Sequence, residues 1–179
     1  MILRRLVEYA ERLEAEGELT PPNYGSFRIN WTIVLLLDGR LEGFIPAPDK
    51  KGTEIIVPRH SVKRTSGIKA DLLADEGEYV LGIPRDPGRS VQAAKQHAAF
   101  IELTRRCAEQ TADPHVKAVL EFLEAWSHGE YRDRLPSELE PRDKMTFRVD
   151  GIIPAQDSDK VREFWTEEQA PDAEGPRMM

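Results

Sequence analysis

The chain has 179 residues, a net charge of −7, and 40% hydrophobic and 32% charged residues, which fits one globular domain that can bury a core. This charge excludes a uniformly basic nucleic-acid-binding protein. The single cysteine, Cys107, excludes an intramolecular disulfide. The N-terminus lacks the apolar stretch of a signal peptide, and the run TIVLLL is too short to span a bilayer. We therefore expect a soluble, cytoplasmic protein without membrane contact.

The first half of the chain predicts a helix followed by strands. Residues 2–16 carry apolar residues at helical spacing, and Gly17 is a plausible stop. Residues 27–37 alternate apolar and polar side chains, which is typical of a strand. Asp38-Gly39 then predicts a hairpin turn. Residues 54–58 and 78–82 are expected to form a third and a fourth strand.

The second half is predominantly helical in pattern. Residues 90–110 place Val91, Ala94, Ala98 and Ile101 at helical spacing, with Phe100, Leu103 and Cys107 on an adjoining stripe. Asp113-Pro114 predicts the start of a second helix, with Val116, Leu120, Leu123 and Trp126 on its buried side. Residues 145–149 suggest a late strand. Asp157 or Ser158 could cap a last helix containing Val161, Phe164 and Trp165.

These elements favour an α+β fold in which a small antiparallel sheet packs with several helices. We expect the folded domain to span residues 1–166. Residues 167–179 are polar and contain proline and glycine, so they are expected to be a disordered tail.

Charge is distributed unevenly along the chain. Between positions 50 and 69, one acid, Glu54, accompanies six bases, which are Lys50, Lys51, Arg59, Lys63, Arg64 and Lys69. That window carries +5, so the remaining residues carry −12. The basic part ends in VKRTSGIK, residues 62–69, called the basic segment below. The next twelve residues, 71–82, hold four acids and no base, and are called the acidic segment.

Signals of enzymatic chemistry are weak. The four histidines, His60, His97, His115 and His128, show no metal-ligand spacing, and no nucleotide-binding or nucleophile motif is present. His97 and Cys107 lie among apolar positions and are expected in the core. The acids Asp71, Asp75, Glu76 and Glu78 lack the pattern of a calcium loop, so an exposed acidic loop is the default. We expect no catalytic residue, no metal site and no cofactor.

The basic segment combines cations, two hydroxyl donors and a glycine, which are the ingredients of a phosphate-contacting loop. An ordinary solvated surface turn is the alternative, and the composition alone does not decide between the two.

An ordered series of motifs carries a family resemblance. The N-terminal MILRRLVEYAERL, the strand FRINWTIVL and the stretch VPRHSVKRTSGIKADLLADEGEYVLG are followed by RSVQAAKQHAAFIEL, DPHVKAVLEFLEAW and MTFRVDGIIPAQDSDKVREFW. Together they resemble the large subunit of the subtype I-C CRISPR surveillance complex, Cascade. The resemblance spans residues 1–166. Because members of that family are much longer, the chain is expected to be their N-terminal domain without the C-terminal helical bundle.

The resemblance implies a non-enzymatic role in antiviral defence. Such a domain samples duplex DNA for a protospacer-adjacent motif and helps to open it for guide-RNA pairing. Its implied partners are other Cascade subunits, guide RNA, target double-stranded DNA and a recruited helicase-nuclease. The family-like residues are Lys63, Arg64, Thr65, Ser66, Gly67, Ile68 and Lys69. Cations would contact phosphates or base edges, hydroxyls would donate hydrogen bonds, and Gly67 would allow close approach.

Further candidates for nucleic-acid contact are Lys50, Lys51, Arg59, Arg85 and Arg89. The chain departs from the family pattern at Ala70-Asp71, where the family has Pro-Asn. Asp71 could face away from DNA, cap the next segment or accept a hydrogen bond from a cytosine amino group.

Two other functions remain open at this point. The domain could be a scaffold that docks the large subunit on the guide-RNA 5′ handle and neighbouring subunits. It could also be a small nucleotide-processing enzyme that uses the acids between Asp71 and Glu78 with a metal. The first predicts that mutation of the basic segment impairs assembly, and the second predicts metal-dependent turnover of nucleic acid.

Overall fold

The computed structural model describes residues 20–60 and 67–170, and the structural statements below concern these residues. The strands are β1 (Tyr24–Ile29), β2 (Trp31–Leu35), β3 (Leu41–Pro46), β4 (Thr53–Pro58), β5 (Ala74–Glu76) and β6 (Lys144–Val149). The α-helices are α2 (Gly77–Val80), α3 (Ser90–Thr111), α4 (Pro114–Ser127), α5 (Pro154–Asp157) and α6 (Asp159–Gln169). Two 3₁₀ turns complete the set, η1 (Pro87–Arg89) and η2 (Arg132–Arg134).

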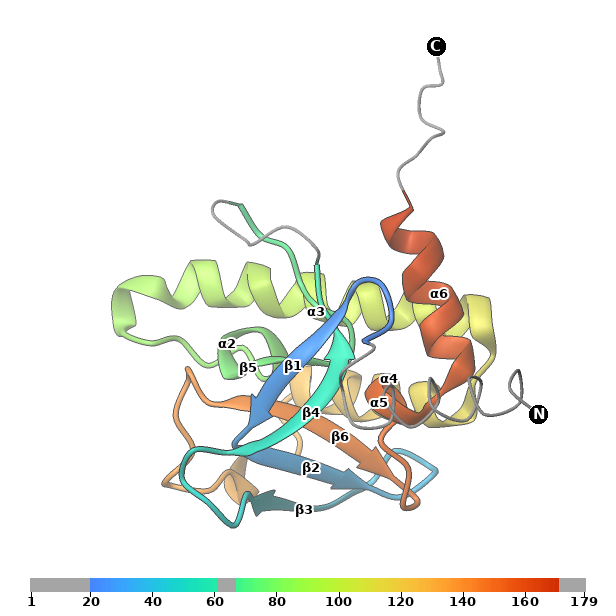
Figure 1. The fold of residues 1–179 in the computed structure, drawn as a ribbon. Coiled ribbons are helices and arrows are strands. Elements are labelled where there is room, and N and C mark those ends of the chain that lie inside the picture. Colours follow the sequence, from blue (N-terminus) through green and yellow to red (C-terminus); the bar gives the residue numbers. More distant parts are fainter. Residues whose placement is uncertain (1–19, 61–66, 171–179) are drawn as a thin grey trace, which may run out of the picture.

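The strands form a four-stranded sheet and a separate two-stranded ribbon. The sheet has the order β3-β2-β6-β5, and the ribbon pairs β1 with β4. Pairing is antiparallel except between β2 and β6, which run parallel. Figure 1 shows the ribbon rising from one end of the four-stranded sheet, with α3 lying above that sheet. The α+β class and the antiparallel sheet packed with helices are confirmed; the parallel pairing with β6 had no signal in the sequence.

The predicted strand 27–37 is two strands that meet at Asn30. Its alternating apolar residues are all buried, as expected: Phe27, Ile29, Trp31, Ile33 and Leu35. The backbone N–H of Asn30 donates to the carbonyl of Lys144 at 2.7 Å, and its side-chain oxygen accepts from the Lys144 N–H at 2.8 Å. These bonds fix the chain where it passes from the ribbon to the sheet. The alternation of buried and exposed side chains therefore continues, although β1 pairs with β4 and β2 pairs with β3 and β6.

The hairpin predicted from Asp38-Gly39 is confirmed between β2 and β3. Gly39 has a φ of +91°, and a Cβ there would lie 2.8 Å from the Cβ of Glu121. Both observations require glycine at this turn. The predicted strand 54–58 is also confirmed, as β4.

The strand predicted at 78–82 is wrong. The strand lies earlier, at β5, and residues 77–80 form the helical turn α2. The backbone N–H groups of Gly77 and Glu78 donate to the carbonyls of Asp143 and Pro141 at 2.9 and 3.1 Å. Contacts with a segment more than sixty positions away therefore override the local strand preference.

The three long helices begin and end close to the predicted positions, but the buried stripe of α3 differs. Phe100, Leu103 and Cys107 are buried, whereas Ala94 and Ala98 are exposed and Val91 is 69% exposed. The prediction that 157 or 158 caps the last helix is confirmed for Ser158, whose hydroxyl accepts from the Val161 N–H at 3.2 Å. The late strand is confirmed as β6.

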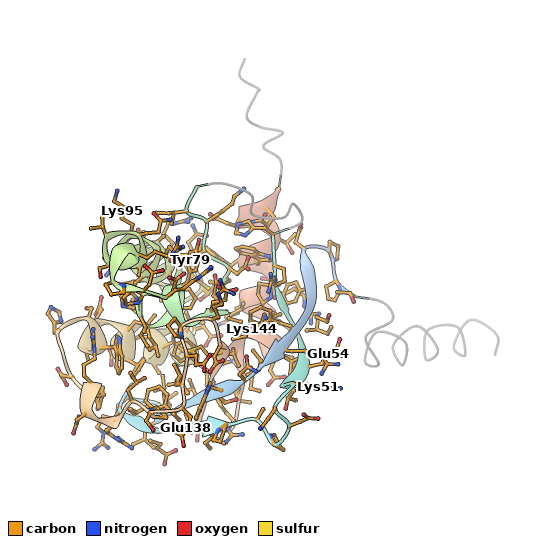
Figure 2. All side chains as sticks on the ribbon, turned by 90° about the vertical axis from the view of Figure 1, so that its left-hand side faces the viewer. Lys51, Glu54, Tyr79, Lys95, Glu138 and Lys144 are labelled. Atoms are coloured by element: carbon orange, nitrogen blue, oxygen red, sulfur yellow. The ribbon has the colours of Figure 1, made fainter. Side chains whose placement is uncertain are left out.

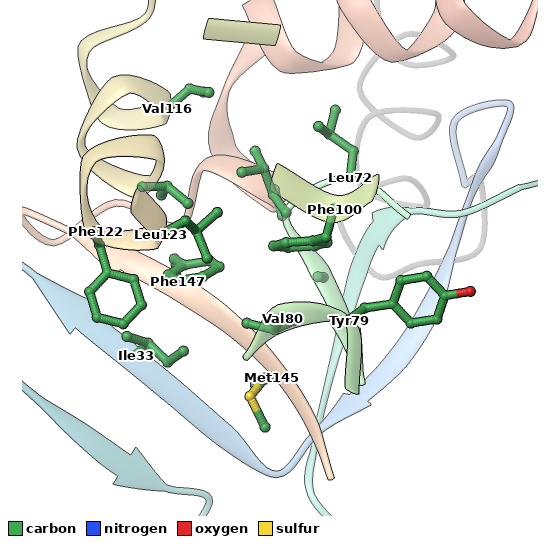
Figure 3. Close-up of a cluster of buried hydrophobic side chains, with 14 of the residues drawn as sticks. Ile33, Leu72, Tyr79, Val80, Phe100, Val116, Phe122, Leu123, Met145 and Phe147 are labelled. Carbon is green, nitrogen blue, oxygen red and sulfur yellow. The ribbon is translucent and has the colours of Figure 1, made fainter. Parts of the chain in front are cut away.

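One hydrophobic core joins the sheet and helices. The Phe147 ring packs against Phe100 and Phe122, with centroids 6.4 and 6.0 Å apart, and Ile33, Val80 and Met145 surround them (Figure 3). Figure 3 also shows the hydroxyl of Tyr79 directed away from this cluster. The predicted helix 2–16 and residues 171–179 of the predicted tail 167–179 lie outside the described residues. Residues 167–169 of that tail are not disordered but form the end of α6. Within residues 20–60 and 67–170, none of the helices has the length and apolarity to cross a membrane.

Candidate nucleic-acid interface

The described part of the basic segment is its end. Lys63, Arg64, Thr65 and Ser66 lie outside the described residues. Gly67 is exposed and has a φ of +77°, and no atom of the described residues lies within 4 Å of a Cβ built on it. Lys69 is also exposed, and its backbone N–H donates to the Tyr79 hydroxyl at 3.3 Å. Tyr79 in α2 thus holds the chain where the segment returns to the core.

Asp71 joins the two flanks of the basic segment. Its Oδ1 accepts from the backbone N–H of His60 at 3.2 Å and lies 2.7 Å from the His60 Nδ1. Its Oδ2 lies 3.4 Å from the Nε of Arg59. The residue is only 1% exposed. The Asp71 carboxylate is therefore directed into the protein and bonded there, which favours the first of the roles considered for it, facing away from a partner.

Arg59 lies against an aromatic ring as well as against Asp71. The guanidinium carbon of Arg59 is 4.4 Å from the centroid of the Phe27 ring, and the Nζ of Lys144 is 5.9 Å from the same centroid. The Arg59 side chain is 33% exposed. Packing against Phe27 restricts both cations to one place on the surface, because each gains attraction from the ring.

The expectation of an exposed acidic loop is wrong. Asp71, Asp75 and Glu78 are 0 to 1% exposed, and only Glu76 is partly exposed. Asp75 accepts from the backbone N–H groups of Asp71 and Glu76 at 2.9 and 2.8 Å. Buried carboxylates need such partners because the loss of hydration is otherwise too costly. The acidic segment is acidic in composition because its carboxylates serve as internal hydrogen-bond acceptors.

Glu78 is the partner of two predicted site residues. Its carboxylate accepts from the Nε and backbone N–H of Arg85, both at 3.0 Å, and from the Nε of Arg89 at 3.2 Å. Burial on its own raises the pKa of the Glu78 carboxyl, but the bonds and charges of Arg89 and Arg85 hold that pKa below its usual value. The two arginine side chains are 35% and 36% exposed, so part of each side chain remains accessible to solvent.

Lys50 and Lys51 do not lie near Arg59 and the end of the basic segment. They are exposed in the turn before β4, and Arg59 follows the far end of that strand. An extended strand rises about 3.3 Å per residue, so Lys51 and Arg59 lie roughly 25 Å apart. Figure 2 shows Lys51 at a distance from Tyr79.

A pocket of about 320 Å³ lies beside His60, between the end of β4, α3 and α6. Ile68, Ala99 and Leu103 supply apolar lining. Arg106 and Glu168 also line it and form an ion pair at 2.7 Å that joins α3 to α6. The His60 ring packs edge-on against Trp165 with centroids 5.0 Å apart. These contacts hold the C-terminal helix to the strand that enters the basic segment.

The expected core residues are confirmed. His97 is buried, and its Nδ1 lies 3.0 Å from the Tyr79 carbonyl oxygen, while its Nε2 has no hydrogen-bond partner among residues 20–60 and 67–170. Burial lowers the pKa of His97, which favours the neutral ring. Cys107 is fully buried, and burial raises its pKa to about 12. In the described residues, no group of three or more His, Cys, Asp or Glu side chains is placed to hold a metal ion.

Two cations near this region had no signal in the sequence. Arg142 lines a groove with Arg85 and Arg89, and Lys144 lies on Phe27 with Arg59. Both come from the segment around the start of β6, far from the basic segment in sequence. Only the pairing of β6 with β2 and β5 brings them here.

Comparison with known proteins supports the resemblance at the level of the family. A search of curated proteins gives no match. The family model described as CRISPR-associated protein (Cas_Csd1) matches residues 6–178, which is almost the whole chain. The chain therefore belongs to the Cas_Csd1 family of CRISPR-associated proteins.

Proposed function

We propose that this chain is a non-enzymatic nucleic-acid recognition module of a subtype I-C CRISPR interference complex. It acts as the N-terminal domain of the large subunit. In this role it samples duplex DNA for a protospacer-adjacent motif and helps guide RNA to open the duplex. Family membership supports a place in CRISPR interference. One observation carries the recognition role. Buried Asp71 bonds to Arg59 and His60 and so holds them next to the end of the basic segment.

The charge balance suits a protein that must release wrong sites quickly. Affinity for random duplex grows with the number of phosphates neutralised. Here the acids of the acidic segment lie behind Arg59, Arg85 and Arg89, so long-range attraction of DNA is weak. Short-range contact by the exposed cations then contributes most of the binding free energy.

The test is charge reversal at Lys63 and Arg64 in the assembled complex. We expect Lys63→Glu with Arg64→Glu to weaken binding of motif-containing duplex at least tenfold in a gel-shift series, while the fold and subunit composition persist. The matched control is Lys117→Glu with Lys160→Glu, which makes the same charge change at exposed positions of α4 and α6.

The scaffold alternative makes a different prediction for the same variant. If the double reversal prevents the subunit from joining the guide RNA and the other subunits, the basic segment docks the subunit and does not contact target DNA. Unchanged duplex binding in an intact complex would contradict the recognition proposal.

A further inference from the structure

Cationic side chains form a connected series around α2, which we call the α2 face. Its members are Arg59, Lys69, Arg85, Arg89, Arg142 and Lys144. Two of these residues are tied to α2 through their side chains, because Glu78 binds Arg85 and Arg89, and Lys69 is tied to it through its backbone N–H, which donates to the Tyr79 hydroxyl. Lys144 lies opposite Glu76 in the β5–β6 register. Figure 2 views the molecule from this side, with Tyr79 and Lys144 labelled.

The hollow on the α2 face is a groove of about 400 Å³, which we call the arginine groove. Arg85, Arg89 and Arg142 line it, together with Asp86, Glu140 and Pro141. Arg142 is exposed, and its side chain makes no hydrogen bond or ion pair with the described residues. Its guanidinium therefore keeps its N–H donors available to a ligand.

Glu78 gives two of these arginines a defined orientation. A carboxylate with 1% exposed side chain binds the inner N–H groups of both guanidiniums. Planar guanidinium groups present donors on more than one edge, so anchoring the inner edge directs the remaining donors outward. Such a preoriented pair suits the two non-bridging oxygens of a phosphodiester.

The acids around the groove set the character of the site. Asp86 and Glu140 line it, and Glu76 lies 3.6 Å from Arg85. The Oδ1 of Asp86 is occupied by the backbone N–H of Gly88 at 3.0 Å. With Glu78 included, four acids surround the three arginines, so the formal charge of this group is −1. A phosphate is therefore held by directed N–H donors and not by long-range attraction, so the groove takes a single phosphodiester group.

We propose that the α2 face contacts the phosphodiester backbone of nucleic acid, with one phosphodiester group in the arginine groove. Glu78 is the positioning residue for Arg85 and Arg89. The proposal rests on the nucleic-acid role proposed above and adds a second contact surface, distinct from Lys63 and Arg64. Lys144 and Arg59 extend it toward the flank of the basic segment, where both lie against Phe27.

The first test replaces Arg142 and Lys144, whose side chains form no hydrogen bond or ion pair with the described residues. In the assembled complex, Arg142→Gln with Lys144→Gln should lower duplex affinity three- to thirtyfold. It should also reduce the slope of log K against log salt by about 0.9 for each lost phosphate contact. The control, Lys117→Gln with Lys160→Gln, should leave both the affinity and the slope unchanged.

The second test separates positioning from net charge. Glu78→Gln keeps the side-chain size and makes the α2 face more positive by one unit. A purely electrostatic role predicts tighter duplex binding. Positioning predicts weaker binding and a smaller salt slope, with near-ultraviolet circular dichroism showing that the fold persists. Tighter binding by a folded Glu78→Gln variant would overturn the role of Glu78.

The phosphodiester could belong to DNA or to the guide RNA, and two measurements on the Arg142→Gln with Lys144→Gln variant distinguish these sources. Loss of duplex affinity assigns the groove to DNA, and loss of guide RNA from the purified complex assigns it to RNA. If the Arg142→Gln with Lys144→Gln variant keeps normal duplex affinity and normal guide-RNA content while the Lys63 and Arg64 variant is defective, the contact by the α2 face is overturned. The recognition role proposed above then still stands. Equal competition by poly-glutamate and by an oligonucleotide would overturn the phosphodiester assignment in favour of an acidic protein partner.

Discussion

Asp71 shows how a single residue can reverse the meaning of a sequence pattern. In the sequence it is an acid placed directly after a basic segment, where it would repel DNA. In the structure its carboxylate is buried and binds Arg59 and His60, which stand before that segment. The acid thus joins the two flanks of the segment from within the protein.

The Asp71 carboxylate is expected to stabilise the fold substantially. Asp71→Ala leaves Arg59 and His60 without this acceptor, and breaking a buried pair of this kind costs about 2 to 4 kcal/mol once the partial exposure of Arg59 is taken into account. Asp71→Asn keeps one acceptor oxygen and should lose less. Urea unfolding monitored by circular dichroism measures both free energies of unfolding.

Glu54 provides the matched control, because its ion pair with Arg28 is exposed. Exposed ion pairs contribute little, so Glu54→Ala should leave the urea midpoint unchanged. An Asp71→Ala variant as stable as Glu54→Ala would show that the bonds to Arg59 and His60 do not stabilise the protein.

At the scale of elements, one Asp–Ser pair begins two helices. The Oδ1 of Asp113 accepts from the His115 and Val116 N–H groups at the start of α4, at 2.8 and 3.4 Å. Its Oδ2 accepts from the Ser158 hydroxyl at 2.8 Å, and Ser158 caps α6. The sequence predicted each cap separately. Their hydrogen bond, across 45 positions, depends on the packing of α4 and α6.

Removal of this pair should destabilise the protein in a pH-dependent way. Asp113→Ala should cost about 1 to 2 kcal/mol, the usual range for a lost N-cap. Burial alone would raise the pKa of Asp113, but bonds from Ser158, His115 and Val116 hold it below its ordinary value of 3.8. Its folded-state pKa is therefore lower than its unfolded-state pKa, so this stabilisation is present above pH 3.8 and is lost as the pH falls through the folded-state value.

Urea unfolding between pH 7 and pH 3 measures this contribution. Asp113→Asn retains one acceptor oxygen for the cap of α4 and removes the charge, so its stability should lose the acid-dependent part of the wild-type profile. Glu109→Ala, at an exposed position of α3, is the neutral control. The assignment is contradicted if Asp113→Ala and wild type differ by the same amount at pH 7 and at pH 3.

At the scale of the molecule, both sheets share one core. Buried residues of the β1–β4 ribbon, the four-stranded sheet and the helices α3, α4 and α6 belong to one packed cluster. Three tryptophans bond across it through their indole N–H groups. Trp31 donates to Asp143 at 2.9 Å, Trp126 to the Leu81 carbonyl at 2.9 Å and Trp165 to the Asn23 carbonyl at 2.8 Å.

A shared core predicts one cooperative unfolding transition. Tryptophan fluorescence reports on β2, α4 and α6, and far-ultraviolet circular dichroism reports on all elements. The two urea transitions should therefore coincide. Trp165→Phe leaves the Asn23 and Arg59 carbonyls without the indole donor, so this single transition should move by about 1 to 2 kcal/mol without splitting.

The control for this variant is Leu37→Ala, because 48% of Leu37 is exposed and its removal should move the transition little. A fluorescence transition that precedes the loss of circular dichroism would contradict the single core and would mean that α6 unfolds separately.

The sequence by itself determined most of the described elements and the family. Alternation identified the extended stretch that contains Phe27 and Ile33, the Asp38-Gly39 pair identified the hairpin between β2 and β3, and helical spacing with local caps identified α3, α4 and α6. The ordered motifs indicated a CRISPR protein, and the family match confirms this level. All of these signals are local, because periodicity, turn geometry and capping depend on residues within a few positions of one another.

Only the tertiary structure decided where the acids of residues 71–78 point and which cations meet. Burial of Asp71, Asp75 and Glu78 depends on bonds to partners such as Arg59, His60, Arg85 and Arg89. Arg142 and Lys144 reach the same face through β6, which pairs with β2, more than a hundred positions earlier. Side-chain burial and long-range pairing depend on the whole packed core, so local patterns could not specify that the acids lie inside and the bases outside.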